Sequence, residues 1–417
     1  MSKIEPKTLK GFRDFLPFEQ IARARFIDTI KASFEAFGFD PLETPALEYA
    51  ETLTGKYGDE GEKLMYRFRD NGDRDVALRY DLTIPLARVV AQNGDLKKPW
   101  RRYQIAPVWR AENTQKGRYR EFYQCDADIV GSTNPLADAE TLVLAGSTLE
   151  RLGVKDFEIR VNDRRLLDAF FDREGIEAGK RVDVLRAIDK VAKVGEAGVA
   201  EELERAGVSA AQSKSILKAL VANEIPQGSE LERIIALARE MNPRLVIKFD
   251  FSIARGLDYY TGLIFETVLI AAPTYGSVLS GGRYDNLVGM FANKPVPAVG
   301  MSIGLDRLFA ALTELKLITL VPTNTRVLIL NMDDSLQADY LRMVSELRAA
   351  GVNTTLYYEA GDMKKQLGYA SDRGIRYSLI YGTKEKEEGK VVIKDMTTGE
   401  QKTSSLNDVV KGLSVSM

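Results

Sequence analysis

The chain of 417 residues carries 58 Lys and Arg, 60 Asp and Glu, one cysteine and no histidine, for a formal net charge of −2. The absence of histidine excludes the usual catalytic triads, histidine-gated pH switches and common zinc sites, and a lone cysteine excludes an internal disulfide. The balanced charge argues against a protein that coats nucleic acid through bulk charge, but it leaves room for a locally basic site.

The expected location is the cytoplasm. Residues 1–20 lack the apolar segment of a signal peptide, and no apolar run has the length needed to cross a membrane. A single cysteine also fits a reducing compartment. We therefore expect a cytoplasmic protein with no membrane partner.

The first predicted region, residues 1–165, mixes helices and strands. Residues 21–37 carry apolar side chains at helical spacing, and Gly38 follows at the position where glycine commonly ends a helix. Residues 157–161 alternate apolar and polar side chains, which predicts a half-buried strand. The region therefore begins with a helix and ends in a sheet.

Residues 166–241 differ in composition and are rich in Ala, Leu, Glu, Lys and Arg. Ser209 and Gln212 have the spacing of a capping box at a helix start, and Ser229 and Glu232 have the same spacing. These patterns predict a small helical insertion domain.

Strand patterns return after the insertion, at residues 245–252 and 263–270. Because they resume the earlier mixture, we expect the insertion to interrupt one domain instead of separating two. Residues 1–165 and 242–320 are therefore predicted to fold together.

Residues 321–325, polar with one proline, are a predicted linker to a C-terminal domain at residues 326–417. Strand and helix patterns alternate along that domain. Such alternation is typical of a compact α/β domain with a mainly parallel sheet. The predicted strands are residues 326–331, 354–358, 377–381 and 391–395, and the predicted helices are residues 336–350 and 363–372.

A basic, aromatic-rich stretch runs from residue 97 to 120 and contains a single acid, Glu112. Arg110 follows an apolar run and is predicted at a strand end, while Gly117 marks a turn to a returning strand. A hairpin loop rich in arginine suits a polyphosphate, because guanidinium groups bind phosphate oxygens in a bidentate manner. Phe122 on the returning strand is placed to stack on a base. A solvated basic face is the alternative.

Three further clusters combine arginine with glycine, at residues 253–262, 280–285 and 299–307. The first contains two consecutive tyrosines, which on a strand would point to opposite faces, one into the core and one into a pocket. Its alternative is a glycine-bounded turn. In the last, glycines precede a predicted helix that carries Arg307. The chain has neither a P-loop nor a dinucleotide fingerprint, so a bound nucleotide must be held in another way.

Together these residues resemble the histidyl-tRNA synthetases, a family of class II aminoacyl-tRNA synthetases. The resemblance implies an α+β catalytic core built on an antiparallel sheet with flanking helices, a small helical insertion and a C-terminal α/β anticodon-binding domain. It rests on the opening residues 11–17, on stretches similar to class II motifs 1, 2 and 3 at residues 37–45, 108–124 and 300–307, on two histidine-specific blocks at residues 255–262 and 280–285, and on the tail at residues 365–367 and 391–395.

The resemblance implies ATP-dependent ligation of L-histidine to the 3′ end of its cognate tRNA through a histidyl-adenylate. Mg²⁺ would accompany ATP, with no metal held by His or Cys, no zinc and no organic cofactor. The implied partners are histidine, ATP, the cognate tRNA and a second copy of the chain in a homodimer.

The family's site residues carry over by position. Arg110 and Arg255 are the implied catalytic residues at the α-phosphate. The implied histidine-binding residues are Asp81, Thr83 and Gln124 at the α-amino group, Asp128 and Tyr260 at the imidazole, and Tyr259, Arg110 and Arg255 around the pocket. The implied ATP-binding residues are Arg110, Glu112, Arg118, Phe122 and Arg307.

Two alternatives belong to a different functional class. One is a non-catalytic relative such as the regulatory subunit of ATP phosphoribosyltransferase, and the other is a histidine or tRNA sensor. Such proteins commonly lose the C-terminal domain or the catalytic arginines, whereas this sequence has both.

The missing histidine has two explanations. Chance or engineering is one. The other is that a histidine-free synthetase could still be translated when histidyl-tRNA runs short, which we state as a hypothesis.

Overall fold

The computed structural model describes residues 4–54, 62–253, 259–292 and 294–414. In the described ranges, no helix is both long and apolar enough to cross a membrane. The chain divides into two compact units, one formed by Met1–Asp14 with Phe26–Ile318 and the other by Phe15–Arg25 with Thr319–Met417.

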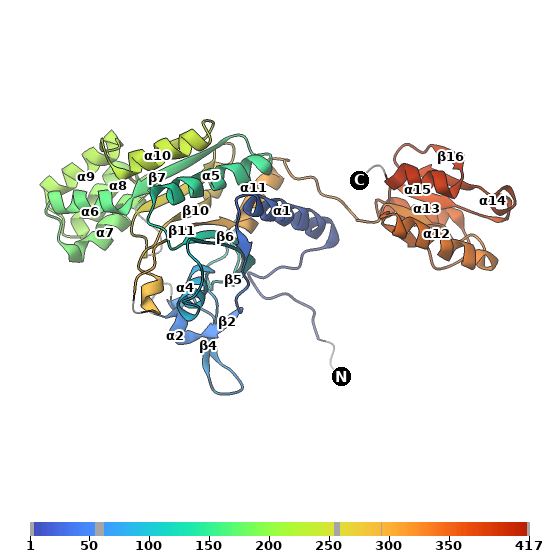
Figure 1. Cartoon of the computed structure of the whole chain (residues 1–417), viewed down its shortest axis with the longest axis horizontal. Helices are drawn as coiled ribbons and strands as arrows, with labels where there is room; N and C mark the ends of the chain where they lie inside the picture. Colours follow the sequence, from blue (N-terminus) through green and yellow to red (C-terminus); the bar gives the residue numbers. More distant parts are fainter. Residues whose placement is uncertain (1–3, 55–61, 254–258, 293, 415–417) are drawn as a thin grey trace. The chain divides into compact units, whose positions relative to one another are not determined.

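An eight-stranded sheet organises the first unit (Figure 1). Its spatial order is β1 (Asp40–Pro41), β5 (Trp100–Trp109), β6 (Glu121–Val130), β11 (Ala298–Gly304), β10 (Ser277–Arg283), β9 (Leu263–Leu269), β7 (Phe157–Asp163) and β8 (Ile247–Phe249). Neighbouring strands are antiparallel except for β1 with β5 and β7 with β8. A largely antiparallel sheet can keep one face for a core and the other for a site.

Helices α5 (Pro135–Arg151) and α11 (Leu305–Glu314) pack on one face of this sheet (Figure 1). The C-terminal half of α1 (Pro17–Ala36) joins them, because the Phe26 ring lies 5.7 Å from Phe309 and the Phe34 ring lies 5.8 Å from Tyr103. Gly38, with a φ of 76°, follows the helix, so the predicted helix and its glycine stop are confirmed.

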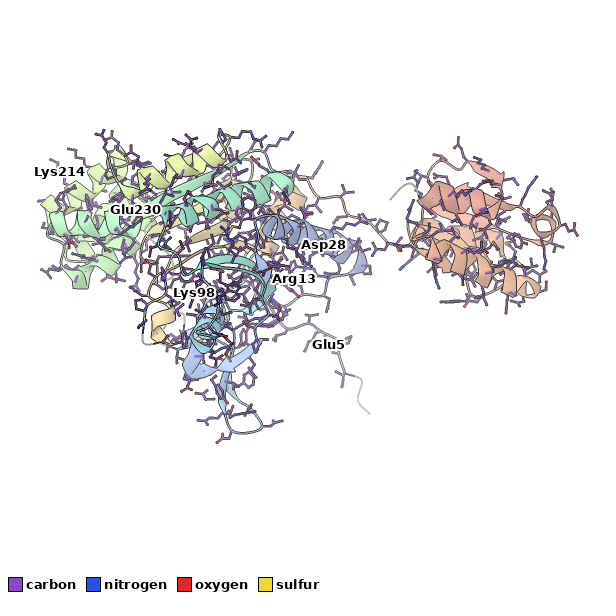
Figure 2. The ribbon with its side chains drawn as sticks, viewed as in Figure 1. Glu5, Arg13, Asp28, Lys98, Lys214 and Glu230 are labelled. Atoms are coloured by element: carbon purple, nitrogen blue, oxygen red, sulfur yellow. The ribbon has the colours of Figure 1, made fainter. Side chains whose placement is uncertain are left out.

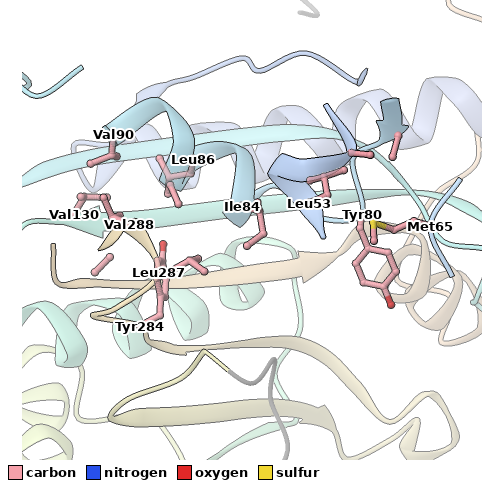
Figure 3. Packing of buried hydrophobic residues seen from close by; sticks show 14 residues of the cluster. Leu53, Met65, Tyr80, Ile84, Leu86, Val90, Val130, Tyr284, Leu287 and Val288 are labelled. Atoms are coloured by element: carbon pink, nitrogen blue, oxygen red, sulfur yellow. The ribbon is translucent and has the colours of Figure 1, made fainter. Parts of the chain in front are cut away.

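Helix α4 (Thr83–Gln92) lies on the other side of the sheet, beside α2 (Ala50–Leu53) and a small sheet in the order β2 (Leu47–Tyr49), β4 (Asp75–Leu78) and β3 (Arg67–Arg69). Figure 3 shows Ile84 and Leu86 of α4 in one cluster with Tyr284, Leu287 and Val288, which follow β10. This second core fixes α4 close to the sheet.

Helices α6 (Arg164–Arg173), α7 (Ala178–Asp189), α8 (Val191–Arg205), α9 (Ala210–Ala222) and α10 (Glu230–Met241) occupy the predicted insertion. The Ser209 hydroxyl accepts from Gln212 N and the Gln212 side chain accepts from Ser209 N, which completes the first predicted capping box. The second is only half correct. Ser229 caps Glu232 N, but the Glu232 carboxylate accepts from Gly228 N at 2.7 Å.

The prediction that residues 157–161 form a half-buried strand is wrong in its burial. Strand β7 is buried along almost its whole length, because it has a neighbour on each side, β9 and β8. Its polar residues are covered by ion pairs. Glu158 pairs with Arg160 at 2.8 Å and with Lys248 of β8 at 2.5 Å.

The second unit contains a five-stranded sheet in the order β13 (Thr354–Leu356), β12 (Val327–Ile329), β14 (Tyr377–Ile380), β15 (Val391–Asp395) and β16 (Gln401–Ser404), with α12 (Gln337–Ala349), α13 (Met363–Asp372), α14 (Thr383–Glu388) and α15 (Leu406–Ser414). The predicted strands and helices are present, but the sheet is mixed. Strand β12 is parallel to β13 and β14, whereas β15 is antiparallel to both of its neighbours. Strand β16 was not predicted, because its polar, largely exposed residues show no apolar alternation.

Candidate active site

Strand β6 supplies the centre of the site, on the face opposite α5 and α11. Successive side chains of a strand point to opposite faces, so Gln124, Asp126 and Asp128 share one face. In the neighbouring strands, Arg102 of β5 and Gly300 of β11 are paired with Asp128. A Cβ atom at Gly300 would collide with the Asp128 carboxylate, so only glycine allows this close approach.

Asp128 lies in a buried ion pair. The Arg102 Nη2 atom is 2.7 Å from Asp128 Oδ2, and both side chains are almost fully buried. The Tyr284 hydroxyl donates a hydrogen bond to Asp128 Oδ1. Arg102 and Tyr284 were not among the predicted site residues. Arg102 has no sequence signal of its own, since a buried arginine on a strand looks like any exposed one, whereas Tyr284 lies in the histidine-specific block at residues 280–285.

Asp81 fixes the first turn of α4 at the edge of the cavity. Its Oδ1 atom accepts from Thr83 N at 3.1 Å and from Ile84 N at 3.0 Å, in the manner of an N-terminal cap. The Asp81 side chain is 1 % exposed. The structure therefore brings Asp81 and Thr83 together at the predicted pocket.

Tyr259 and Tyr260 precede β9 instead of lying on a strand, and Tyr259 lies in a turn, so the strand prediction is wrong and the alternative of a turn is correct. Their rings contact each other with centroids 5.1 Å apart, and both are partly buried. A Cβ atom at Gly282 would come within 2.9 Å of the Tyr260 ring. Burial and the nearby Asp128 raise the pKa of Tyr260, so its phenol stays neutral and able to donate.

The site face of the sheet presents buried acceptor atoms. Gln124 Nε2 donates to Ser302 Oγ at 2.8 Å, which leaves Gln124 Oε1 without a hydrogen-bond partner among the described residues. Asp126 Oδ1 is likewise buried and without such a partner within the described ranges. Because buried polar atoms are nearly always hydrogen-bonded, these acceptors call for a ligand rich in N–H donors.

Arg110 follows β5, at the predicted strand end. Its Nε atom donates to the Tyr80 carbonyl at 3.0 Å, and its guanidinium lies 4.3 Å from the Tyr80 ring and 5.2 Å from the Phe122 ring. Glu112 lies 4.0 Å from Arg110 and 3.7 Å from Arg118. Phe122 itself sits on β6, as predicted.

Arg307 adds a third cation from the first turn of α11. Its Nη1 atom donates to the Ser277 carbonyl at 2.5 Å. Burial lowers the pKa of Arg307, and Arg118 and Arg110 lower it further, while Glu112 opposes the shift. Three arginines that repel one another around one acid form a site that an anion would stabilise.

The hairpin between β5 and β6 has the predicted glycine turn. Gly117 has a φ of 70°, and Gln115 and Arg118 bridge the loop. Lys116 forms an ion pair with Glu314 of α11 at 2.6 Å. The loop that carries Arg118 is therefore attached to the helix that carries Arg307.

The opening residues also support this region. Arg13, labelled in Figure 2, pairs with the buried Asp306 of α11 at 2.5 Å and lies over the Tyr119 ring at 3.2 Å. Asp306 in turn accepts from Tyr123 N at 2.8 Å. This contact gives the N-terminal signature a structural role that its sequence did not reveal.

Arg255 lies outside the described residues, so its predicted position stays a prediction. The other predicted residues gather in two neighbouring groups on the site face. The described part of the chain shows no cluster of three or more acidic or cysteine side chains arranged to hold a metal ion. The acceptor-lined group contains Asp81, Thr83, Gln124, Asp128, Tyr259 and Tyr260, and the cationic group contains Arg110, Glu112, Arg118, Phe122 and Arg307.

Comparisons with known proteins match this arrangement. Residues 11–308 match the family model described as histidyl-tRNA synthetase, and residues 323–415 match the one described as anticodon binding domain. A histidine–tRNA ligase of Rhodopirellula baltica is 44% identical over 95% of this chain and 95% of its own length. One from Clostridium tetani is 41% identical over 98% of each. The histidyl-tRNA synthetase structure from Nostoc sp. PCC 7120 has a TM-score of 0.88 and 34% identity, covering 100% of both chains.

The antiparallel sheet, its arginine-bearing hairpin and the separate C-terminal domain are those of a class II aminoacyl-tRNA synthetase. The predicted fold class is thus confirmed. Within that class, the chain belongs to the histidyl-tRNA synthetase family.

Proposed function

We propose that this chain attaches L-histidine to the 3′ end of its cognate tRNA in two steps, through a histidyl-adenylate made from histidine and ATP. The observation that supports this most directly is the group of buried, unpartnered acceptor atoms beside three arginines, within the described residues. A ligand with several N–H donors fits the cavity, and a polyphosphate fits the arginines. The full-length match to histidine–tRNA ligases supports the same reaction.

Histidine would fill the acceptor-lined group. Its α-ammonium would lie among Asp81, Thr83 and Gln124, where the side chains of Asp81 and Gln124 have buried oxygen atoms. Its imidazole would be read by Asp128 and Tyr260, an acceptor and a hydroxyl that match its two nitrogens. Tyr259 would close the pocket against Tyr260.

ATP would lie along the arginine group. Phe122 would stack on adenine and Glu112 would meet the adenine edge, while Arg118 and Arg307 would bind the outer phosphates. Arg110 would contact both the α-phosphate and the histidine carboxylate, with Arg255 on the other side. Mg²⁺ would arrive with the triphosphate as part of the substrate complex.

Adenylate formation requires no histidine side chain in the enzyme. The attacking carboxylate is already ionised at neutral pH, so no general base is needed. The barrier lies in bringing two anions together and stabilising charge on the α-phosphate, which positioning and fixed positive charge supply. Arg110 is held for this by the Tyr80 carbonyl. In the second step, the tRNA 3′-terminal ribose would attack the adenylate and a phosphate oxygen would take its proton.

The remaining partners are proposed at the level of domains. Residues 326–417 would bind the anticodon region, residues 166–241 would form the insertion, and residues 1–165 with 242–320 would form the catalytic domain. We also propose a cytoplasmic homodimer. An inactive regulator is not favoured, because the match to ligases covers nearly the whole chain.

Aminoacylation separates these functions. Purified protein incubated with ATP, labelled histidine and total tRNA should form acid-stable, base-labile histidyl-tRNA. A histidine or tRNA sensor would bind its ligands without forming this ester. Binding of histidine without ester formation, at saturating ATP and tRNA, would overturn the proposed function.

A further inference from the structure

Asp126 has no role in the reaction as described so far, yet it lies at the centre of the site face. It sits between Gln124 and Asp128 along β6 and directly opposite Ser302 of β11. Its side chain is 2 % exposed, and Oδ1 has no hydrogen-bond partner among the described residues. Burying a carboxylate is costly, so its presence at this position calls for a function.

Ser302 lies beside both Asp126 and Gln124. Gln124 Nε2 donates to Ser302 Oγ at 2.8 Å, so the Ser302 oxygen acts as an acceptor in that contact. A serine hydroxyl has a single proton to give. Asp126 is the residue opposite Ser302 in the strand register, and the Ser302 hydroxyl lowers the pKa of Asp126, as a donor to the carboxylate does.

The hydrogen bonding of Ser302 fixes which end of the Gln124 amide faces the ligand. While Asp126 takes the Ser302 proton, Ser302 can only accept from Gln124, so the amide nitrogen faces Ser302 and Oε1 faces the ligand. If residue 126 donated to Ser302 instead, the hydroxyl proton would be available to Gln124 Oε1. The amide would then turn over and present its NH₂ group to the cavity, where it would repel an ammonium ion.

We propose that Asp126 is a positioning residue that acts through Ser302 to hold the Gln124 amide with its oxygen toward the α-ammonium of histidine. The inference rests on the proposed function, because it assumes that this cavity binds histidine. It assigns to Asp126 a role that the proposed function leaves open.

The charges around Asp126 make this device sensitive to pH. Arg102 of β5 favours the ionised carboxylate, while burial, Asp128 and Asp81 raise the pKa of Asp126 to about 7. Tyr259 and Tyr260 also face it, from the segment before β9. Protonated Asp126 becomes a donor, so histidine affinity is expected to fall as the pH drops through about 7. Asp126→Asn should lack this pH dependence of histidine affinity. The titration of free histidine affects both proteins equally, so it cancels in the ratio of their dissociation constants.

Two ligands that differ in one group provide the test. Histidine and 3-(imidazol-4-yl)propionate share the imidazole and the carboxylate, but only histidine has the α-ammonium. Asp126→Asn should weaken histidine binding at pH 8 by about 10- to 100-fold, as for loss of a hydrogen bond to a charged group. The same substitution should change the dissociation constant of 3-(imidazol-4-yl)propionate by less than about threefold, since that ligand has no α-ammonium. Calorimetry with the full-length protein measures both dissociation constants.

Asp128→Asn is the matched control on the same strand, because it should weaken both ligands through the imidazole. Gln124→Glu supplies the rescue, since a carboxylate presents an acceptor in either orientation. In a Gln124→Glu background, Asp126→Asn should cost less than about threefold in histidine affinity. If Asp126→Asn does not fold, Ser302→Ala carries the same ligand comparison.

The outcomes separate the possible errors. Equal losses for both ligands in Asp126→Asn, or no loss for histidine in both Asp126→Asn and Ser302→Ala, would overturn the proposal, because an asparagine oxygen can still accept the Ser302 proton. An undiminished loss in the Gln124→Glu background would show direct contact with the ammonium, which also overturns it. A wild-type protein that binds neither histidine nor the propionate contradicts the proposed function itself.

Discussion

At the scale of single residues, the site depends on buried charge. Asp126 and Asp128 lie one above the other on β6 with Arg102 as the buried cation paired to Asp128. Buried charged groups lower the stability of the fold unless they are paired. They are therefore typical of binding sites, where function requires them. The arginines at the neighbouring group show the same conflict, since Arg110 and Arg118 lower the pKa of Arg307.

Replacing Asp126 tests this conflict through stability. Burial raises its pKa to about 7 in the folded protein, from the ordinary aspartate value of 3.8. The unfolded chain therefore ionises first as the pH rises, and folding loses stability between roughly pH 4 and pH 7. Unliganded Asp126→Asn should be more stable than the wild type at pH 8, with the difference disappearing below pH 4. Urea denaturation at several pH values measures it, and a constant difference across this range would contradict the assignment.

Arg110→Lys tests the arginine group. A lysine keeps the charge but cannot reproduce a planar guanidinium that bonds the Tyr80 carbonyl and lies over the Phe122 ring. The rate of histidine-dependent ATP–pyrophosphate exchange should fall by about 10²- to 10³-fold, as for loss of a preorganised donor at a transition state. Arg69→Lys, on the exposed β3–β4 hairpin, is the control and should keep its rate. Near-normal exchange in Arg110→Lys would remove Arg110 from the mechanism.

At the scale of elements, local patterns predicted helix ends better than they predicted strands and loops. The Ser209 capping box and the Gly38 stop depend on neighbours in sequence, so the sequence alone contains them. The conformations of strand β16 and of the Tyr259–Tyr260 loop depend on tertiary packing. The spacing of apolar residues within these segments does not reveal that packing.

Motif spacing predicted residues that the structure brings together on one face of the sheet, because each motif lies on one strand or turn. Arg102, Ser302 and Tyr284 were missed because their roles exist only across strands. Arg102 gains its role from Asp128 on the neighbouring strand, and Ser302 from Gln124 and Asp126. Cross-strand register is set by the whole sheet and is not visible in a single sequence.

The N-terminal segment is predicted to act on the nucleotide side of the site. Arg13 pairs with the buried Asp306, which holds both Tyr123 N and the start of the helix that carries Arg307. Arg13→Ala should raise the KM for ATP about tenfold, an effect of about 1.4 kcal/mol, while histidine affinity changes little. Lys7→Ala, exposed on the same segment, is the control. Equal effects on both substrates would mean that the segment supports the fold as a whole.

At the scale of the whole molecule, the absence of histidine is compatible with chemistry that uses fixed charge and no proton shuttle. Synthesis of the proposed enzyme would also not depend on its own product, because none of its 417 residues is delivered by histidyl-tRNA. This remains a hypothesis. If close natural relatives contain histidine at ordinary frequency and tolerate starvation equally well, the explanation fails.

Starvation provides a direct check. In cells limited for histidine, accumulation of this chain should continue when that of histidine-containing proteins of similar length stops. Lys214 lies at an exposed position in the insertion (Figure 2). Accumulation of the Lys214→His variant should stop, as it does for the histidine-containing proteins. Equal accumulation of the wild type and of Lys214→His would show that the absence of histidine does not affect synthesis of the protein during starvation.

The most direct test of the account is the amino-acid dependence of ATP–pyrophosphate exchange by the purified wild-type chain. Each of the twenty amino acids is supplied separately at the same concentration with ATP and Mg²⁺. The acceptor-lined cavity predicts exchange with histidine and background rates with the other nineteen. No exchange with histidine, or equal exchange with another amino acid, would contradict the proposal that this cavity selects histidine for adenylation.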